Sequence, residues 1–366
     1  MKTVVYRNKK IDLFIFALMN DLKYLMAYTI PMSALFGILL LDWYSYITII
    51  YVFVFIPLLE AIFSTNKTRF SKEEKNNRLK NKIFDWFLYL NVPIVFGILF
   101  LSLYTLNNYS LKTYELIGII LSTGLVLATN GINVAHELGH RRSRAEKTLS
   151  KILLLPCLYM HFFIEHNYGH HKNVATPDDP ASAKKNQNLY SFWATSVIGQ
   201  YIGAWKIQSE MLKRKKLSIL SFENDMLYYS IFQFLYLCFL GILFGWSTSI
   251  FAICIAVISF LVLETINYIE HYGLSRQKID GKYEKIKNTH SWNSDHKIGR
   301  IVLYELTRHS DHHFISTKKY QVLETKDDSP QLKFGYPSSM ILAMIPPAWF
   351  YFCLLYTSDA ADELRS

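Results

Sequence analysis

The chain has 366 residues and 51% of them are hydrophobic, yet its formal net charge is +10. Together with a mean hydropathy of +0.14, these values exclude an evenly mixed water-soluble chain, because apolar and charged residues have to be segregated along the sequence. Such segregation is typical of integral membrane proteins.

At the N-terminus, several basic residues precede an apolar segment, 11–19, that is too short to cross a membrane. No small-residue cleavage site follows it, so we do not expect a removed signal peptide. Six later apolar segments each approach the roughly 20 residues that a transmembrane helix needs. They are 24–41, 44–63, 83–103, 114–135, 226–246 and 247–267. The predicted fold is therefore an all-α integral membrane protein with six transmembrane helices, formed by residues 1–352.

Three other segments are interpreted from their composition. Residues 152–164 are apolar but too short to span, so we expect them to lie against the membrane or dip into it. Residues 172–224 are predicted as a polar connection. Residues 340–356 are apolar and contain Pro346 and Pro347, which favours an interfacial or re-entrant segment.

The four cysteines lie far apart, each within an apolar run, at Cys157, Cys238, Cys254 and Cys353. They form no CxxC pair that would hold a metal, and their spacing indicates no disulfide framework. We expect all four to be small buried hydrophobic residues.

Lysine and arginine are unevenly distributed among the loops. The turns at 42–43 and 245–249 contain none and 104–113 contains only Lys112, whereas the N-terminus, 67–82 and 141–225 are rich in them. The rich segments are predicted to be cytoplasmic. The fourth and sixth spans then both end on the cytoplasmic side.

Nine of the twelve histidines occur in four short clusters. Two clusters follow the ends of the fourth and sixth spans and two lie in segments predicted to be cytoplasmic, so all four are expected on one membrane face. On a helix, residues three or four apart share a face, so the histidines within a cluster converge. Neutral imidazoles suit a transition metal better than they suit a packed core. The predicted metal ligands are His136, His140, His166, His170, His171, His271, His309, His312 and His313.

Each motif has a plainer interpretation when it is taken alone. HELGH matches the zinc-protease helix pattern, with Glu137 as the base, and five-letter matches occur by chance. His161, His290 and His296 have no partner at helical spacing, so we expect structural roles, with hydrogen bonding to a ligand as the alternative.

Nine imidazoles exceed the capacity of one ion, since tetrahedral zinc takes four ligands and octahedral iron about six. Two metals are therefore expected. Zinc has no redox chemistry, so a nitrogen-rich double site at a membrane surface favours iron and dioxygen. No catalytic residue beyond the ligands is predicted.

Polar residues near the ligands are candidates for orienting them. Asn133 and Glu264 precede His136 and His271 by three and seven residues, and so lie on the same helix faces. The acidic residues next to predicted ligands in the sequence are further candidates: Glu137, Glu165, Glu270 and Asp311.

Longer motifs carry a family resemblance. HELGH, EHNYGHH followed by VATPDDPAS, NYIEHYGL, HSWNSDH, LTRHSDHH, GYPSSM and a Pro-Pro-x-Trp-Phe ending occur in that order. The chain resembles the membrane-bound alkane monooxygenases (alkane hydroxylases) from the first span to about Phe352. The resemblance implies the nine histidines as ligands of two iron ions. It also implies insertion of one oxygen atom of O2 into the terminal C–H bond of an n-alkane. The electrons would come from a rubredoxin, which a rubredoxin reductase reduces.

The sequence departs from this pattern in three places. Arg141 stands where lysine is common, and Thr307 stands where glutamine is usual. The tail 353–366 does not resemble the family and looks like translated adaptor sequence, so we expect the natural C-terminus to be missing, with a genuine acidic tail as the alternative.

The residues also indicate how electrons and substrate arrive. There is no Gly-rich dinucleotide motif and no four-cysteine iron site, so electrons must come from another molecule. A basic cytoplasmic face would attract an acidic carrier. The alkane would enter from the bilayer, and its maximum length would depend on the first bulky side chain of the channel. Val52 is the candidate channel residue, with a lipid-facing position as the alternative.

Three other functions are considered. A membrane zinc protease would leave most histidines unused, and a metal transporter or iron sensor would need polar residues through the bilayer midplane. Hydroxylation or desaturation of fatty acyl chains is the main alternative, because the wider histidine-rich membrane superfamily shares the clusters. We expect no nucleic acid among the partners.

Overall fold

The computed structural model describes residues 21–63 and 65–353. The N-terminal apolar segment 11–19 and the tail from residue 354 lie outside the described residues. Within them, six helices are long and apolar enough to cross a membrane, as predicted. These spans are Leu22–Leu40, Asp42–Ile62, Ile83–Asn108, Thr113–Gly139, Asp225–Phe244 and Trp246–His271.

Several spans are composed of more than one helical type. The first joins a 3₁₀ helix η1 (Leu22–Tyr28) to α2 (Thr29–Leu40), and the third joins α6 (Ile83–Tyr89) to α7 (Asn91–Asn108). The fifth and sixth are single helices, α14 (Asp225–Phe244) and α15 (Trp246–His271). The second consists of η2 (Asp42–Tyr46), α3 (Ile47–Ile50), η3 (Tyr51–Phe55) and α4 (Ile56–Ile62), and the fourth of α8 (Thr113–Val126), η4 (Leu127–Ile132) and α9 (Asn133–Gly139).

Two of these segments, η3 and η4, are π-helical, and a third π-helical segment, η5 (His166–His170), follows outside the spans. A π-helical turn fits an extra residue into the helix and is frequent at functional sites. Two of the three segments, η3 and η4, line an apolar cavity, and η5 carries two of the clustered histidines.

The remaining elements are shorter, apart from one helix. They are α5 (Lys72–Lys80), α10 (Arg144–Leu154), α11 (Phe162–Glu165), α12 (His171–Asn173), α13 (Leu189–Arg214), α16 (Lys297–Val302), α17 (His309–Phe314) and α18 (Tyr336–Ala343), with short 3₁₀ helices η6 (Asn288–His290) and η7 (Tyr320–Val322). The strands of the described part are β1 (Lys278–Ile279) and β2 (Lys282–Tyr283), which form one small hairpin.

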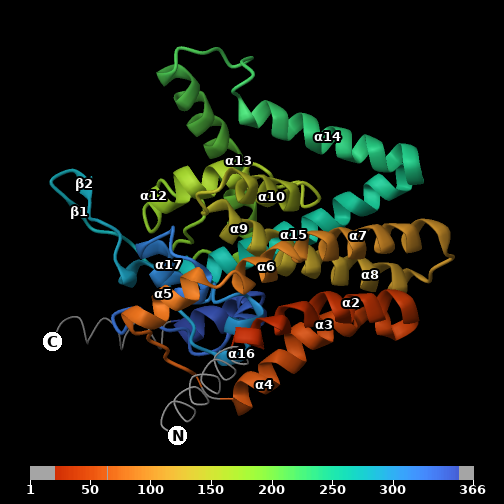
Figure 1. Cartoon of the computed structure of the whole chain (residues 1–366), viewed down its shortest axis with the longest axis horizontal. Coiled ribbons are helices and arrows are strands. Elements are labelled where there is room, and N and C mark those ends of the chain that lie inside the picture. The colour runs from red at the N-terminus through yellow and green to blue at the C-terminus, as the bar shows by residue number, and fades with distance from the viewer. Residues whose placement is uncertain (1–20, 64, 354–366) are drawn as a thin grey trace, which may run out of the picture.

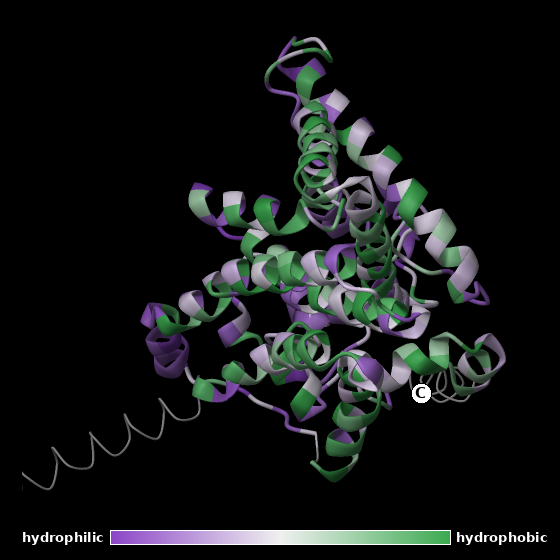
Figure 2. Cartoon of the chain, turned by 90° about the vertical axis from the view of Figure 1, so that its right-hand side faces the viewer, coloured by the Kyte–Doolittle hydropathy of each residue, from purple (hydrophilic) through white to green (hydrophobic). Residues whose placement is uncertain are grey.

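The two ends of the bundle differ. In Figure 1 the turns from α2 to η2, α7 to α8 and α14 to α15 lie at the right, whereas α5, α12 and α17 lie toward the left. Figure 2 shows hydrophobic residues along the long helices and hydrophilic residues in the short elements and connections. The fourth and sixth spans therefore deliver their C-terminal ends to the polar end of the molecule, where the histidines lie.

Burial separates the central span from the peripheral ones. The fourth span is 83% buried, whereas the second and fifth are only 28% and 22% buried. A helix that is apolar all round and buried all round belongs to the interior of a bundle. Exposed apolar side chains on the second and fifth spans would be lipid-facing in a bilayer.

Two sequence-based expectations about connections were wrong. Most of 152–164 is packed inside the protein rather than against lipid, with Leu153, Leu154 and Cys157 fully buried, because α10 packs along α9. The section 172–224 is not simply a polar connection, since α13 forms a long helix within it. The sequence of α13 shows no clear apolar helical stripe, because its buried face includes the polar and small residues Ser196, Gln200 and Ala204.

The expectation for the cysteines holds only for Cys157. Cys238 and Cys353 are partly exposed, and Cys254 is exposed. The physical reason is that Cys238 and Cys254 lie on membrane-spanning helices, whose outer faces carry apolar residues outward.

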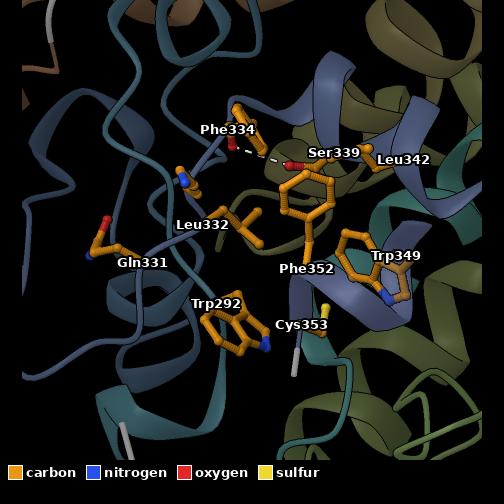
Figure 3. A pocket seen from close by; sticks show the side chains of 10 residues that line it. Trp292, Gln331, Leu332, Phe334, Ser339, Leu342, Trp349, Phe352 and Cys353 are labelled. Atoms are coloured by element: carbon orange, nitrogen blue, oxygen red, sulfur yellow. Dashed lines mark hydrogen bonds between the residues drawn. The ribbon is translucent and has the colours of Figure 1, made fainter. Parts of the chain in front are cut away.

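The C-terminal described segment folds back onto the polar end. A second short helix, 346–353, begins at the two prolines after α18, and proline is well tolerated in a first helical turn. Figure 3 shows Trp349 and Phe352 from this helix beside Leu332 and Phe334, with a hydrogen bond from Ser339 Oγ to the Phe334 carbonyl (3.1 Å). The cavity between them is only about 40 Å³. Its lining contains no histidine, and the interfacial location of this segment stays a prediction.

Candidate metal centre

The spans deliver two of the histidine clusters directly. His136 lies in α9 at the end of the fourth span and His140 caps that helix, while His271 is the last residue of α15. Since the two spans run in the same direction, the imidazoles meet at one end of the bundle. This common end is what the charge pattern of the loops had predicted for them.

The other two clusters come from short elements. The π-helical η5 carries His166 and His170 and is followed at once by His171. The helix α17 carries His309, His312 and His313, which are three and four residues apart and therefore share one face. These short helices place six imidazoles against the three from the spans.

The structure brings all nine predicted ligands together in two groups, within each of which the nitrogen atoms lie within 4.8 Å of one another. The five-histidine group consists of His136, His140, His166, His171 and His312, and the four-histidine group consists of His170, His271, His309 and His313. Neighbouring Nε2 atoms are 2.9–3.2 Å apart in both groups.

Hydrogen bonding among the imidazoles cannot account for this convergence. The Nε2 atoms of His140, His166 and His171 form a triangle with sides of 3.1 Å. Each Nε2 of a neutral ring offers either one proton or one lone pair, so a triangle satisfies at most one of its three contacts. A cation between the nitrogen atoms satisfies all of them, and the residues therefore fit a bound metal.

The spacing also bears on the geometry of such an ion. Two nitrogen ligands about 2.1 Å from one ion are about 3.0 Å apart at a right angle and about 3.4 Å apart at the tetrahedral angle. The separations of 2.9–3.1 Å within the five-histidine group match right angles. This donor set suits a five- or six-coordinate ion better than a tetrahedral one.

Burial keeps the imidazoles neutral, which is the form that binds a metal. Desolvation, followed by repulsion from His170, lowers the pKa of His312 to about 3. Desolvation and the neighbouring imidazoles also lower the pKa of His166 and His309 well below its usual range. The two groups differ in access, since His140 and His171 are partly exposed whereas every member of the four-histidine group is buried.

Carboxylates contact the four-histidine group. Asp179 Oδ2 accepts a hydrogen bond from His170 Nδ1 (2.9 Å), which leaves His170 Nε2 directed at the centre. Glu270 Oε2 lies 3.2 Å from His309 Nε2, and its other oxygen accepts a hydrogen bond from the Tyr336 hydroxyl (2.6 Å). Glu270 was among the sequence candidates, but Asp179 was missed. The sequence signal for Asp179 is the second aspartate of TPDDP, nine residues after His170.

The two polar residues chosen from helix spacing do not orient an imidazole. Asn133 donates to the Leu303 carbonyl (3.2 Å). Glu264 accepts hydrogen bonds from four neighbours, namely Tyr159, Ser196, Gln200 and Asn267. The prediction failed because helix spacing gives a shared face but does not say what covers that face. The partner of Asn133 is the Leu303 carbonyl, and only two of the four partners of Glu264 come from α13.

Two other acidic candidates, Glu137 and Asp311, form ion pairs and hydrogen bonds with neighbouring segments of the chain. Glu137 Oε1 pairs with Arg141 (2.7 Å) and accepts a hydrogen bond from the Tyr320 backbone (3.2 Å). Asp311 pairs with Lys318 and Lys326. These contacts tie the segment after α17 to α9. Glu137 is therefore engaged in structure, which argues against its use as the base of a protease.

The remaining sequence candidates belong to neither histidine group. For Glu165, Oε2 is buried without a hydrogen-bond partner among the described residues. His161, His290 and His296 belong to neither group, as expected for structural residues. His161 is buried between the rings of Tyr159 and Tyr201.

Val52 faces the protein interior. Its side chain is 6% exposed, and it lines a small apolar cavity of about 30 Å³, here called the inner cavity, together with Thr129 of η4 and Tyr336. Tyr336 leads to the four-histidine group through Glu270. Of the two positions considered for Val52, the structure therefore has the inward one.

A larger apolar cavity of about 370 Å³, here called the outer cavity, lies beside the inner one. It is lined by residues of the second, fourth and sixth spans, by Trp193 of α13 and by Ile341 and Met344, which are exposed at the surface. The fold and the centre thus define a class of protein, namely polytopic membrane proteins with a histidine-rich candidate metal centre beside apolar cavities.

Comparison with known proteins narrows this class. The family model for fatty acid desaturases matches residues 113–329. The chain is 36% identical to an alkane 1-monooxygenase of Pseudomonas putida, over 86% of this chain and 76% of that protein. It is also 36% identical to alkane 1-monooxygenase 2 of Pseudomonas aeruginosa, over 88% and 89% of the two chains. A xylene/toluene monooxygenase hydroxylase component of Pseudomonas putida is 28% identical over 72% and 70%. The chain therefore belongs to the fatty acid desaturase family and, more narrowly, to the alkane 1-monooxygenases.

Proposed function

We propose that this protein hydroxylates n-alkanes at the terminal carbon, giving primary alcohols. The reaction consumes one alkane, one O2, two electrons and two protons, and yields one alcohol and one water. The nine histidines of the two groups would hold two iron ions, which supply the capacity to activate dioxygen when bound. This is the activity for which the similar Pseudomonas proteins are named.

The observation that carries the proposal is that the four-histidine group, whose spacing fits a metal ion, is connected to an apolar cavity. Its members are buried, and Tyr336 connects it, through Glu270, to the inner cavity. The inner cavity also reaches Thr129 and Ile266, which precede His136 and His271 by seven and five residues. At about 1.5 Å per residue, this places the cavity roughly 8 to 11 Å along the helices from those ligands.

The role of this chain's residues follows from that arrangement. The apolar lining would bind the alkane and exclude water. Asp179 would hold the His170 ring by accepting a hydrogen bond from its Nδ1, and Tyr336 would hold the Glu270 carboxylate by donating a hydrogen bond to it. The ligands would therefore keep their positions while the substrate end approaches them.

Electrons would come from a rubredoxin that its reductase keeps reduced. The four cysteines lie on separate segments, so they form no iron site of their own within this chain. The proposed location is the cytoplasmic membrane with the centre on the cytoplasmic side, supported by the lysine and arginine distribution of the loops. A net charge of +10 favours an acidic electron carrier.

A fatty acyl hydroxylase or desaturase is the second candidate, favoured by the match to the fatty acid desaturase model. The structure offers an observation against it. The described lining of the outer cavity is almost wholly hydrocarbon, with Thr265 as the polar exception beside the Trp193 indole. An acyl headgroup would need polar or charged partners at the entrance.

The test uses the full chain in nanodiscs with rubredoxin, rubredoxin reductase, NADH and ¹⁸O2. A ladder of n-alkanes and a parallel ladder of fatty acyl substrates are supplied, and products are identified by mass spectrometry. The expected products are 1-alkanols carrying ¹⁸O, with two iron atoms per chain by metal analysis. Products from the acyl ladder alone would replace the proposal with the second candidate. One zinc and no iron would overturn the metal assignment.

A further inference from the structure

The two apolar cavities are separated by three side chains. Phe53, Leu125 and Val262 line both the inner and the outer cavity. The outer cavity, at about 370 Å³, is within the range of roughly 300–1,000 Å³ that is usual for small-molecule sites. The inner cavity, at about 30 Å³, holds no more than about a single water-sized group. A chain that passes from one to the other must therefore displace at least one of the three.

The surroundings of these three side chains single out Phe53. Leu125 is 3% exposed on the central, fourth span, so it has little room to move. Val262 is β-branched and is restricted at χ1. Phe53 is partly exposed and packs against both hydrophobic clusters of the protein. It also lies in the π-helical η3, where the regular helical hydrogen bonding is interrupted.

We infer that Phe53 is the gate between a lateral entrance for apolar chains, the outer cavity, and the inner cavity beside the four-histidine group. Rotation of its ring would join the two cavities into one continuous path. The inference rests on the proposed alkane hydroxylation, and it adds an entrance and a residue that controls passage and chain length.

The entrance has a fixed frame around this movable side chain. The Trp193 indole donates to Thr265 Oγ1 (3.1 Å), which links α13 to α15 at the mouth. The Tyr190 hydroxyl donates to the Met344 carbonyl (2.8 Å), which links α13 to the C-terminal segment. Because these hydrogen bonds hold the mouth of the outer cavity on both sides, the Phe53 side chain is the part that would control which alkanes pass.

The matched variants are Phe53→Ala and Phe55→Ala. Both remove one ring from η3, but Phe55 is exposed on the outer side of the same turn. Phe53→Ala should shift the ratio of kcat/KM for long over short alkanes upward by roughly tenfold, a change expected when a pocket is resized. Phe55→Ala should leave that ratio unchanged. The opposite change, Phe53→Trp, should lower kcat/KM for all alkanes, because a larger ring closes the passage.

A second measurement does not depend on turnover. An n-alkane carrying a diazirine is added to the protein in nanodiscs, photolysed, and located by peptide mapping. In the original sequence, labels are expected near Met344 and Trp193 of the outer cavity and near Thr129 and Tyr336 of the inner one. Phe53→Trp should remove the inner labels and keep the outer ones, and Phe55→Ala should change neither.

The outcomes separate the gate from the proposed function. An unchanged length ratio in Phe53→Ala, with inner labelling retained in Phe53→Trp, overturns the gate whatever the enzyme does. Failure of excess n-alkane to reduce the outer labelling would mean that lipid chains occupy that cavity, which overturns the entrance. If the original sequence makes no alcohol but its labelling pattern responds to Phe53, the path stands and the alkane hydroxylation falls. Iron content of each variant shows whether the centre is intact.

Discussion

The five-histidine group and the four-histidine group contain the same kind of ligand in different surroundings. Two members of the first, His140 and His171, are partly exposed at the polar end, whereas all members of the second are buried. Carboxylates contact the second group, through Asp179 and Glu270, and Glu270 leads on to the inner cavity. The difference teaches that one centre offers two approaches: a polar one suited to an electron carrier and an apolar one suited to a hydrocarbon.

The largest expected effect comes from removing one ligand from each group. His312→Ala and His309→Ala should each abolish turnover, and metal analysis should show about one iron lost per chain, because under the proposed function each side chain would bind a different ion. The control is His161→Ala, since His161 is buried outside both groups and its Nε2 has no hydrogen-bond partner among the described residues. An active His312→Ala protein with full iron would break the division into two groups.

The next effect concerns the carboxylate that supports the buried group. Asp179→Asn should lower metal affinity or activity by about 10–100-fold, which is usual when the partner of a ligating histidine is changed. Asp178→Asn is the matched control, because Asp178 is its exposed neighbour. Metal titration followed by activity measures both. Equal losses in the two variants would show that the loop, rather than the His170 contact, is responsible.

Substrate length tests whether the apolar approach leads to the four-histidine group. Val52→Trp places a large rigid ring in the inner cavity, so it should reduce activity on long alkanes by roughly tenfold while sparing short ones. Val54→Trp, on the exposed side of the same turn, should keep the original profile. Product ratios over an alkane ladder give the answer. A profile shifted equally by both variants would remove the inner cavity from the substrate path.

The smallest effect concerns the polar approach. Reduction by an acidic donor such as rubredoxin should slow several-fold as ionic strength rises, because the Debye length is about 10 Å at 0.1 M salt. Lys172→Glu, at an exposed residue next to His171, should slow it further, whereas Lys112→Glu at the opposite end of the bundle should not. Stopped-flow reduction rates measure this. A flat salt profile would exclude electrostatic steering of the donor.

Much of the site was accessible without coordinates, but its supports were not. Spacing identified the nine histidines because residues three and four apart on a helix must share a face. Spacing failed for Asn133 and Glu264, since most of their partners, Leu303 and two side chains of α13 among them, lie far away in the sequence. Arg141, which stands where the family commonly has lysine, is buried and pairs with Asp85 and Glu137.

The sequence by itself determined the six spans, the common end of the fourth and sixth spans, and the residues that could serve as ligands. These depend on hydropathy, charge and helical periodicity, which are properties of neighbouring residues. Only the tertiary structure decided the division into five and four, the contact of Asp179 with His170, and the inward position of Val52. These depend on which faces of separate helices meet, and the packing of the whole bundle determines that.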